Sequence, residues 1–238
     1  YVGSTLSGFD VKPSGGGTSF TAYADLIEDV HIDRTGAVST TAISFDNTRD
    51  NATIKNVSLI SNSVDGSNDT GIYGENVKIE NFYTDALPES SASLYISDPG
   101  ATIKELYIKG GNLQFGDPGN VILENFTIKD SLPGVIGPSI RMPFAEGDIE
   151  IRNGLITNTA GGIYVEGDSF DPVYSVTIEN VQLDSLSGEG APQGAIYVSG
   201  MDEVTIKNVT SNRTINPDQQ GAINIFGGTN HNITNTTL

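Results

Sequence analysis

One phrase recurs along the whole chain and restricts it to a repetitive fold. SVTIENVQL at residues 175–183 returns as EVTIKNVTS at residues 203–211, and looser copies occur from residue 5 to residue 238. An apolar residue marks the same place in each copy, and the intervals between these marks run from 20 to 28 residues. A period of this length, with strand-like alternation inside each unit, is typical of a solenoid. The marking residues are Leu6, Ile27, Ile54, Ile79, Ile103, Leu123, Ile151, Ile178, Ile206 and Ile233.

Each repeat has room for three short strands. The phrase supplies one strand before its Asn and one after it, and a third alternating run lies upstream, as in GIYVEG at 162–167 and AIYVSG at 195–200. Gly, Asn, Asp and Pro separate these runs, which is the pattern of strands rather than of helices. We therefore expect an all-β chain in which residues 1–238 form a single parallel β-helix domain with three sheets and about nine to ten coils. The domain is expected to be part of a longer chain or assembly.

The residue after each mark is expected to point outward, and in the eight copies from Ile27 to Ile206 it is charged, with a sign that alternates from copy to copy. Equivalent residues on successive coils lie about 4.8 Å apart, so alternating signs attract where like signs would repel. The sequence therefore predicts a ladder of opposite charges that fixes the register of the coils. Its members are Glu28, Lys55, Glu80, Lys104, Glu124, Arg152, Glu179 and Lys207.

Asn occupies the next position in most copies. Asn tolerates the left-handed conformation of a tight bend, and stacked amides can hydrogen-bond from coil to coil. We expect these amides to be buried in the bend between two sheets. They are Asn56, Asn81, Asn125, Asn153, Asn180, Asn208 and Asn235, with Gly8, Asp29 and Glu105 in the remaining copies.

An asparagine ladder at such a bend resembles that of the pectin-lyase-like family of right-handed β-helices, over nearly the whole chain. The resemblance implies a right-handed helix. It leaves activity open, because the family includes lyases, hydrolases, esterases, viral tailspikes and adhesins, and a fold does not fix a function.

The family resemblance also implies that saccharide binds along the outer face of the strands that precede the phrase. The outward residues of those strands are expected to be Thr21, Ser44, Tyr73, Tyr95, Gln114, Arg141, Tyr164, Tyr197 and Asn224. Of these, we take Tyr73, Tyr95, Gln114, Arg141, Tyr164 and Tyr197 as candidate ligand-binding residues. Tyr suits sugar rings and protein partners equally, whereas the alternative is that aromatic residues simply pair across strands.

Catalysis is the alternative function. Arg141 and Glu166 are the candidate catalytic residues, because Glu166 can lie beside Arg141 on the next coil, and an exposed ion pair explains the same neighbourhood. Further acids on the loop side are Asp46, Glu75 and Asp117. Glycoside hydrolysis needs paired carboxylates, and β-elimination needs a base beside a uronate. The Gly-His-Gly and Arg-Ile-Lys runs of polygalacturonases and the Trp-Ile-Asp-His-like stretch of pectate lyases do not occur, which weighs against an enzyme.

Composition excludes several classes of partner. The net charge is −18, so the surface repels phosphate backbones, and nucleic acid is not an expected partner. No apolar run approaches the length of about 18 residues that a membrane span needs. There is no Cys and no calcium-loop motif; we expect no metal site or cofactor, with Ca²⁺ in the acidic loops left open. An acidic balance also suits a protein from a high-salt organism or a merely acidic secreted one.

Asn-x-Ser/Thr sequons hint at an extracellular glycoprotein. The candidate glycosylation sites are Asn51, Asn68, Asn212 and Asn232, because the sequons at Asn56, Asn125, Asn208 and Asn235 fall on the expected buried ladder. We expect an extracellular protein of a cell or virion surface, used for attachment or as a structural spike. Its expected partners are a glycan or cell-surface receptor, and sibling subunits or further domains at the coil ends. The alternative is a secreted polysaccharide lyase or glycoside hydrolase.

Overall fold

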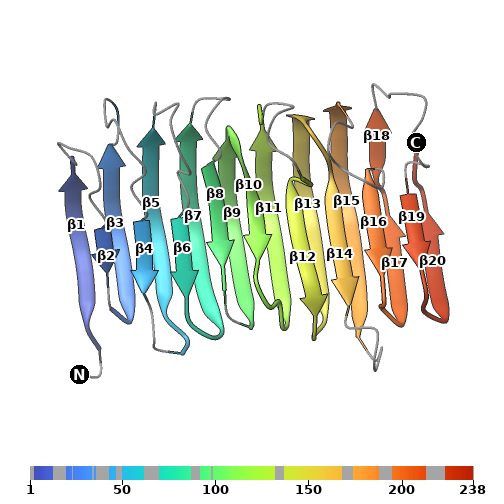
Figure 1. The fold of residues 1–238 in the computed structure, drawn as a ribbon, viewed down its shortest axis with the longest axis horizontal. Coiled ribbons are helices and arrows are strands. Elements are labelled where there is room, and N and C mark those ends of the chain that lie inside the picture. Colours follow the sequence, from blue (N-terminus) through green and yellow to red (C-terminus); the bar gives the residue numbers. More distant parts are fainter. Residues whose placement is uncertain are drawn as a thin grey trace.

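The computed structural model describes residues 3–12, 20–22, 24–33, 35, 43–46, 50–61, 70–86, 92–97, 99–131, 137–167, 174–187, 195–212 and 223–237. Of residues 20–22, 43, 44, 46, 61, 92 and 93 it describes the backbone alone. All regular structure in these ranges is β-strand, so the expected all-β class is confirmed. The strands stack along the long axis of the molecule, and the two termini lie at opposite ends (Figure 1).

Two parallel sheets run the length of the stack. Sheet A contains β1 (Thr5–Val11), β3 (Leu26–Asp33), β5 (Thr53–Ser61), β7 (Val77–Ala86), β9 (Ala101–Lys109), β11 (Val121–Lys129), β13 (Ile149–Thr159), β15 (Ser175–Leu186), β17 (Glu203–Lys207), β18 (Thr210–Asn212) and β20 (Asn230–Thr234). Sheet B contains β2 (Phe20–Ala22), β4 (Ile43–Asp46), β6 (Thr70–Tyr73), β8 (Ala92–Ile96), β10 (Gly111–Phe115), β12 (Ile140–Ala145), β14 (Ile163–Gly167), β16 (Ile196–Ser199) and β19 (Ile223–Phe226). Neighbours in each sheet follow chain order, as a β-solenoid requires. They are two elements apart in the numbering, except that β18 makes β16 and β19, and β17 and β20, three apart.

The repeat phrase sets the register of sheet A. Every marking residue pairs with the marking residue of the next coil, from Leu6 opposite Ile27 to Ile206 opposite Ile233. A one-residue slip would turn all these apolar side chains outward, so the repeat itself specifies the pairing. The parallel β-helix expected from the phrase is confirmed.

The expected three sheets appear as two, because the two halves of the phrase belong to one bent sheet. β15 pairs with β17 through its first half and with the separate strand β18 through its second half. About six full turns, from β6 to β17, are described with side chains in both sheets, fewer than the nine to ten coils expected. The strand stacks continue beyond these turns at both ends.

The bend in sheet A lies at the asparagine position, where the backbone is left-handed in every coil. The φ angles there run from 50° at Asn235 to 71° at Gly8. Amide groups donate from coil to coil, for example from Asn180 to Asn153 at 3.1 Å and from Asn208 to Asn180 at 2.9 Å. Glu105 interrupts this ladder, and Asn81 and Asn125 on either side of it do not bond through it.

The expectation that these amides are buried is wrong. All seven ladder asparagines are exposed, because the bend turns their side chains away from the core. A second bend lies toward the C-terminal ends of these strands in four coils, at Gly110, Asp130, Asn158 and Ser185, where φ lies between 52° and 79°. Asn158 donates to Asp130 there at 3.0 Å. The sequence repeat gave no indication of this second bend.

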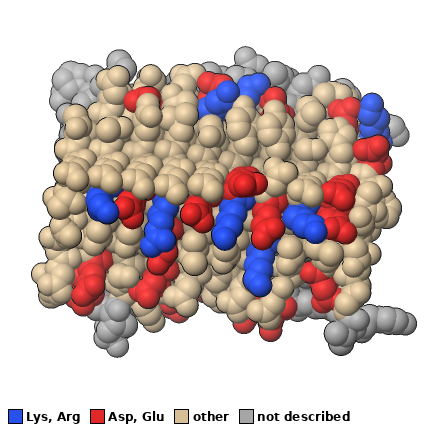
Figure 2. Space-filling model, turned by 180° about the vertical axis from the view of Figure 1, so that it is seen from behind, with Lys and Arg blue, Asp and Glu red and all other residues tan. Residues whose placement is uncertain are grey.

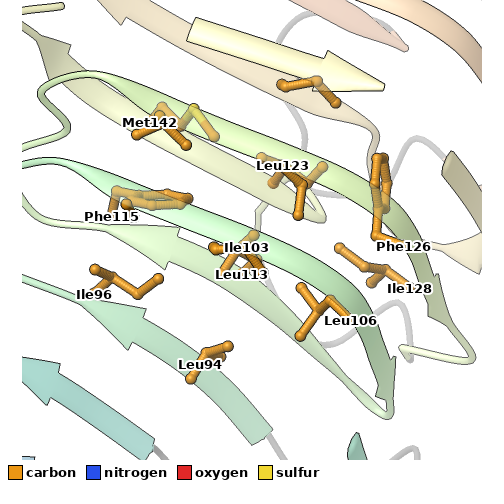
Figure 3. Packing of buried hydrophobic residues seen from close by; sticks show 14 of the residues in the cluster. Leu94, Ile96, Ile103, Leu106, Leu113, Phe115, Leu123, Phe126, Ile128 and Met142 are labelled. Atoms are coloured by element: carbon orange, nitrogen blue, oxygen red, sulfur yellow. The ribbon is translucent and has the colours of Figure 1, made fainter. Parts of the chain in front are cut away.

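The core fills the space between the sheets. Side chains from β8, β10 and β12 of sheet B meet those from β9 and β11 of sheet A, as Figure 3 shows for Leu113, Ile103 and Leu123. Nearly all inward Ile, Leu and Val are fully buried. Phe45 of sheet B and Phe82 of sheet A meet edge to face at 6.4 Å, which links the two sheets directly.

The charge ladder is in register along sheet A, and Figure 2 shows it as alternating blue and red groups across one face. Two of its contacts close as ion pairs, Glu28 with Lys55 and Glu179 with Lys207, both at 2.7 Å. Arg152 instead pairs at 2.9 Å with Glu150 of its own strand. The predicted alternation of charge is therefore confirmed, but only two of the neighbouring pairs in the ladder form ion pairs.

Candidate functional site

The outer face of sheet B carries one row of side chains in register, which we call the outer row. Pairing of the strands aligns Thr21, Ser44, Gly71, Tyr95, Gln114, Arg141, Tyr164, Tyr197 and Asn224. All but one of these residues are those expected from the sequence. Gly71 replaces Tyr73, which lies two residues further along β6, while the side chains of Thr21 and Ser44 lie outside the described residues.

The ring of Tyr73 nevertheless lies over the outer row. A Cβ atom at Gly71 would lie 2.6 Å from the Tyr73 ring, so the ring covers this glycine. The Tyr73 and Tyr95 rings meet edge to face, with centroids 6.5 Å apart. Because Gly71 has no side chain, the displaced ring can fill its place in the row.

A second group of rings lies further along the row. Tyr164 and Tyr197 stack with centroids 4.9 Å apart and planes 11° from parallel, and Phe226 continues the group 5.6 Å from Tyr197. Phe226 is 50% exposed. Stacked rings cover one another's faces, so the surface that Tyr164 and Tyr197 offer consists largely of ring edges and hydroxyl groups.

Glu166 holds the hydroxyl group of Tyr164. The hydroxyl donates to Glu166 Oε2 at 2.6 Å, and burial together with this bond raises the pKa of Tyr164. Tyr164 is therefore a neutral donor at physiological pH. Arg141 and Glu166 form no ion pair with each other; Arg141 lies opposite Tyr164, two residues before Glu166.

Arg141 lies in the middle of the outer row and is exposed. It forms no ion pair with any described residue, as is also true of Lys78, Lys104 and Lys129, whereas Lys12, Lys55, Lys109, Arg152 and Lys207 do. Its neighbour Gln114 donates to Asn112 at 3.2 Å, which orients the Gln114 amide. A guanidinium group with free donors suits hydroxyl and carboxylate oxygens of a ligand.

A β-bulge in β12 adds to this face a residue that the sequence did not predict there. Pairing between β12 and β14 shifts register between Met142 and Ala145, so that Pro143 and Phe144 together lie opposite Glu166. Phe144 is 63% exposed and has a left-handed backbone, with φ of 54°. Proline inside a strand was the available signal, since it marks bulges and edge positions.

The remaining acids near this face do not gather around Arg141. Glu75 and Asp117 are exposed in the turns after β6 and β10, and neither forms a contact with Arg141 or Glu166 in the described structure. Asp46 pairs by backbone with Tyr73, and its side chain is outside the described residues. Within the described ranges, no three His, Asp or Glu side chains are grouped so that they could hold a metal ion.

Several side chains on the outer face of sheet A bind one another. Besides the charge ladder, Tyr83 and Tyr107 stack at 4.7 Å, and the Lys129 ammonium lies 5.3 Å from the Tyr107 ring centre. Lys109 pairs with Asp85 at 2.8 Å, and Tyr83 donates to the same carboxylate at 3.1 Å. These groups satisfy one another, whereas Glu80, Lys104 and Glu124 of the charge ladder form no ion pair with a described residue.

The candidate glycosylation sites are exposed wherever they are described. Asn51 lies in the turn before β5, and Asn212 and Asn232 lie on β18 and β20, while Asn68 is outside the described residues. The ladder sequons are exposed as well, which removes the reason for excluding Asn56, Asn125, Asn208 and Asn235. What distinguishes them is that their amides are hydrogen-bonded along the ladder.

Comparison with known proteins adds no relative. No protein-family model, curated protein or solved structure matches the chain. Among the described residues, no helix has the length and apolar character to cross a membrane. The function must therefore be argued from the surface itself.

Proposed function

We propose that this β-helix is an attachment module of a cell or virion surface and binds glycans along the outer row of sheet B. The observation that carries the proposal is the order of side chains in that row. Tyr95, with the Tyr73 ring beside it, stands at one side. Tyr164 and Tyr197, with Phe226 beside them, stand at the other, and Gln114 and Arg141 lie between the two groups. A linear glycan lying along the axis meets rings at both ends and hydrogen-bond donors at its centre.

The chemistry of this row fits a sugar better than a purely apolar partner. Saccharides combine apolar ring faces with many hydroxyl groups, and the row combines aromatic surface with the Arg141 guanidinium and the Gln114 amide. Regular spacing of about 4.8 Å between strands gives a repeating ligand a repeating surface. The exposed sequons agree with an extracellular location.

Binding to immobilised neutral, uronate-containing and sialylated glycans tests the proposal. We expect Tyr197→Ala and Arg141→Ala to weaken binding by about 1 to 3 kcal/mol, the range for truncated interface anchors. Tyr107→Ala is the matched control, because it removes one ring of a stacked Tyr pair from sheet A. If Tyr107→Ala weakens binding as much as Tyr197→Ala, or if no glycan binds, the proposal is wrong.

The same glycans test the enzymatic alternative, a polysaccharide lyase or hydrolase. Incubation with the protein would then release unsaturated or reducing ends, and Glu166→Gln would abolish the release while leaving binding in place. Undiminished release by Glu166→Gln would exclude Glu166 from the chemistry. Binding without any release supports the attachment module.

A further inference from the structure

Phe144 combines two features that are unfavourable for folding. Its backbone is left-handed, a conformation in which the Cβ atom of an L-residue crowds the following carbonyl group, and which a bulky residue rarely adopts. The residue is 63% exposed, the largest exposed fraction among the described large hydrophobic residues. Residues on both sides, Pro143 and Ala145, are buried. The fold therefore holds this one ring out of the core at a cost.

The bulge that creates this geometry is well supported by the surrounding sequence. A bulge leaves one residue without its ladder hydrogen bond, and Pro143 has no N–H group to leave unpaired. Met142 and Ala145 anchor the strand in the core on either side. Bulges re-aim side chains next to functional sites, and strained backbone is concentrated at ligand contacts.

The position of the bulge ties Phe144 to the outer row. Pro143 and Phe144 lie opposite Glu166, which accepts the hydrogen bond from Tyr164, and Arg141 is three residues before Phe144 on the same strand. Phe144 forms no ring contact with another described ring, whereas Tyr164 and Tyr197 cover each other. Among the described aromatic residues near the centre of the row, Phe144 is thus the one that is not covered by another ring.

We propose that Phe144 is a specificity-determining residue of the glycan site, whose ring takes the apolar face of one sugar unit. This inference rests on the proposed glycan binding. The bulge presents the ring beside the donors of Arg141, and the sugar's hydroxyl groups reach Arg141 and Glu166 while its C–H face lies on Phe144. Without the bulge, the strand would offer a single outward residue opposite Glu166.

Replacement by residues that accept a left-handed backbone gives a test with opposite effects on folding and binding. Phe144→Gly and Phe144→Asn remove the ring and relieve the backbone, so we expect an unchanged or higher melting temperature and binding weakened about tenfold on the glycans that the wild type binds. Phe144→Tyr keeps the ring and should keep the binding. Ile122→Ala is the control, because Ile122 is a 38% exposed apolar residue on sheet A.

The outcomes separate this inference from the proposed function. Wild-type affinity in Phe144→Gly, while Tyr197→Ala is impaired, overturns the role of Phe144 and leaves glycan binding in place. A clear fall in melting temperature in both Phe144→Gly and Phe144→Asn also overturns it, because the ring would then serve folding. A wild-type protein that binds no glycan overturns both.

Discussion

Lys207 donates a hydrogen bond to Glu179 across 2.7 Å, at the one place where two nearly identical copies of the repeat phrase carry opposite charges. The reversal is what allows the two copies to stack in register, because two Glu or two Lys side chains would be neighbours otherwise. Small sequence differences between repeats therefore carry structural information that the shared residues do not.

Charge reversal tests this relationship. Glu179→Lys places three cations in a row, Arg152, the new side chain and Lys207, and we expect a loss of stability that becomes smaller as salt rises, because exposed charges are screened. Adding Lys207→Glu should restore part of the loss by re-forming one pair. Urea unfolding at low and high salt measures both effects; a loss independent of salt would contradict a charge ladder.

The ion pair also predicts a direction of pH dependence. The hydrogen bond from Lys207 lowers the pKa of Glu179 below its usual value, so the pair contributes stability above the pKa of the unfolded chain and loses it as pH falls through the folded value. We expect Lys207→Met to raise the pKa of Glu179 toward the ordinary range. Carboxyl NMR titration of Glu179 in both proteins checks this, and equal pKa values would show that the contact is absent in solution.

The rows of sheet A could be predicted because one short repeat contains both the marking residue and the outward charge. Sheet B was less predictable, since its strands are joined to the phrase by connections of variable length. Tyr73 illustrates the difference, because the sequence predicted it to lie opposite Tyr95, whereas Gly71 is the residue that pairs with Tyr95. Phe144 was missed because a bulge breaks the alternation that identifies outward residues.

The exposure of the asparagine ladder was mispredicted for a different physical reason. A left-handed residue was correctly assigned to each bend, but the amides of these residues were expected to be buried in it. The structure turns these side chains outward, where amide hydrogen bonds between coils such as Asn235 to Asn208 compete with water. Conformational preference could thus be read from the sequence, whereas the direction of the bend could not.

Gly154 and Phe126 form a complementary pair in the core of sheet A. They are in register on adjacent strands, and a Cβ atom at Gly154 would lie 2.0 Å from the Phe126 ring. We expect Gly154→Ala to lower stability by about 1 to 3 kcal/mol, as overpacking does. Phe126→Leu in the same chain should recover part of the loss in thermal unfolding. Additive losses for the two changes would show that the residues do not share this space.

Thr84 carries a buried hydroxyl group without a hydrogen-bond partner, in a row otherwise filled by Leu59 and Ile108. Thr84→Val replaces the hydroxyl with a methyl group of similar shape, so we expect stability to rise by about 1 kcal/mol. Denaturant unfolding measures the change. Thr53→Val is the comparison, because Thr53 is partly exposed and its replacement should have little effect; a destabilised Thr84→Val would indicate that the hydroxyl has a partner in solution.

Glu105 is the defect in the asparagine ladder and offers a test of what the ladder contributes. It adopts the same left-handed backbone as its neighbours, with φ of 58°. Its side chain forms no hydrogen bond with Asn81 or Asn125 on the adjacent coils. Asn tolerates this backbone better than Glu and supplies the missing amide, so we expect Glu105→Asn to raise stability by about 0.5 to 1.5 kcal/mol. Glu105→Gly separates the two causes, because it relieves the backbone without adding the amide. If Glu105→Gly stabilises the chain as much as Glu105→Asn does, the coil-to-coil amide bonds contribute nothing, and the asparagines are present for their backbone conformation alone.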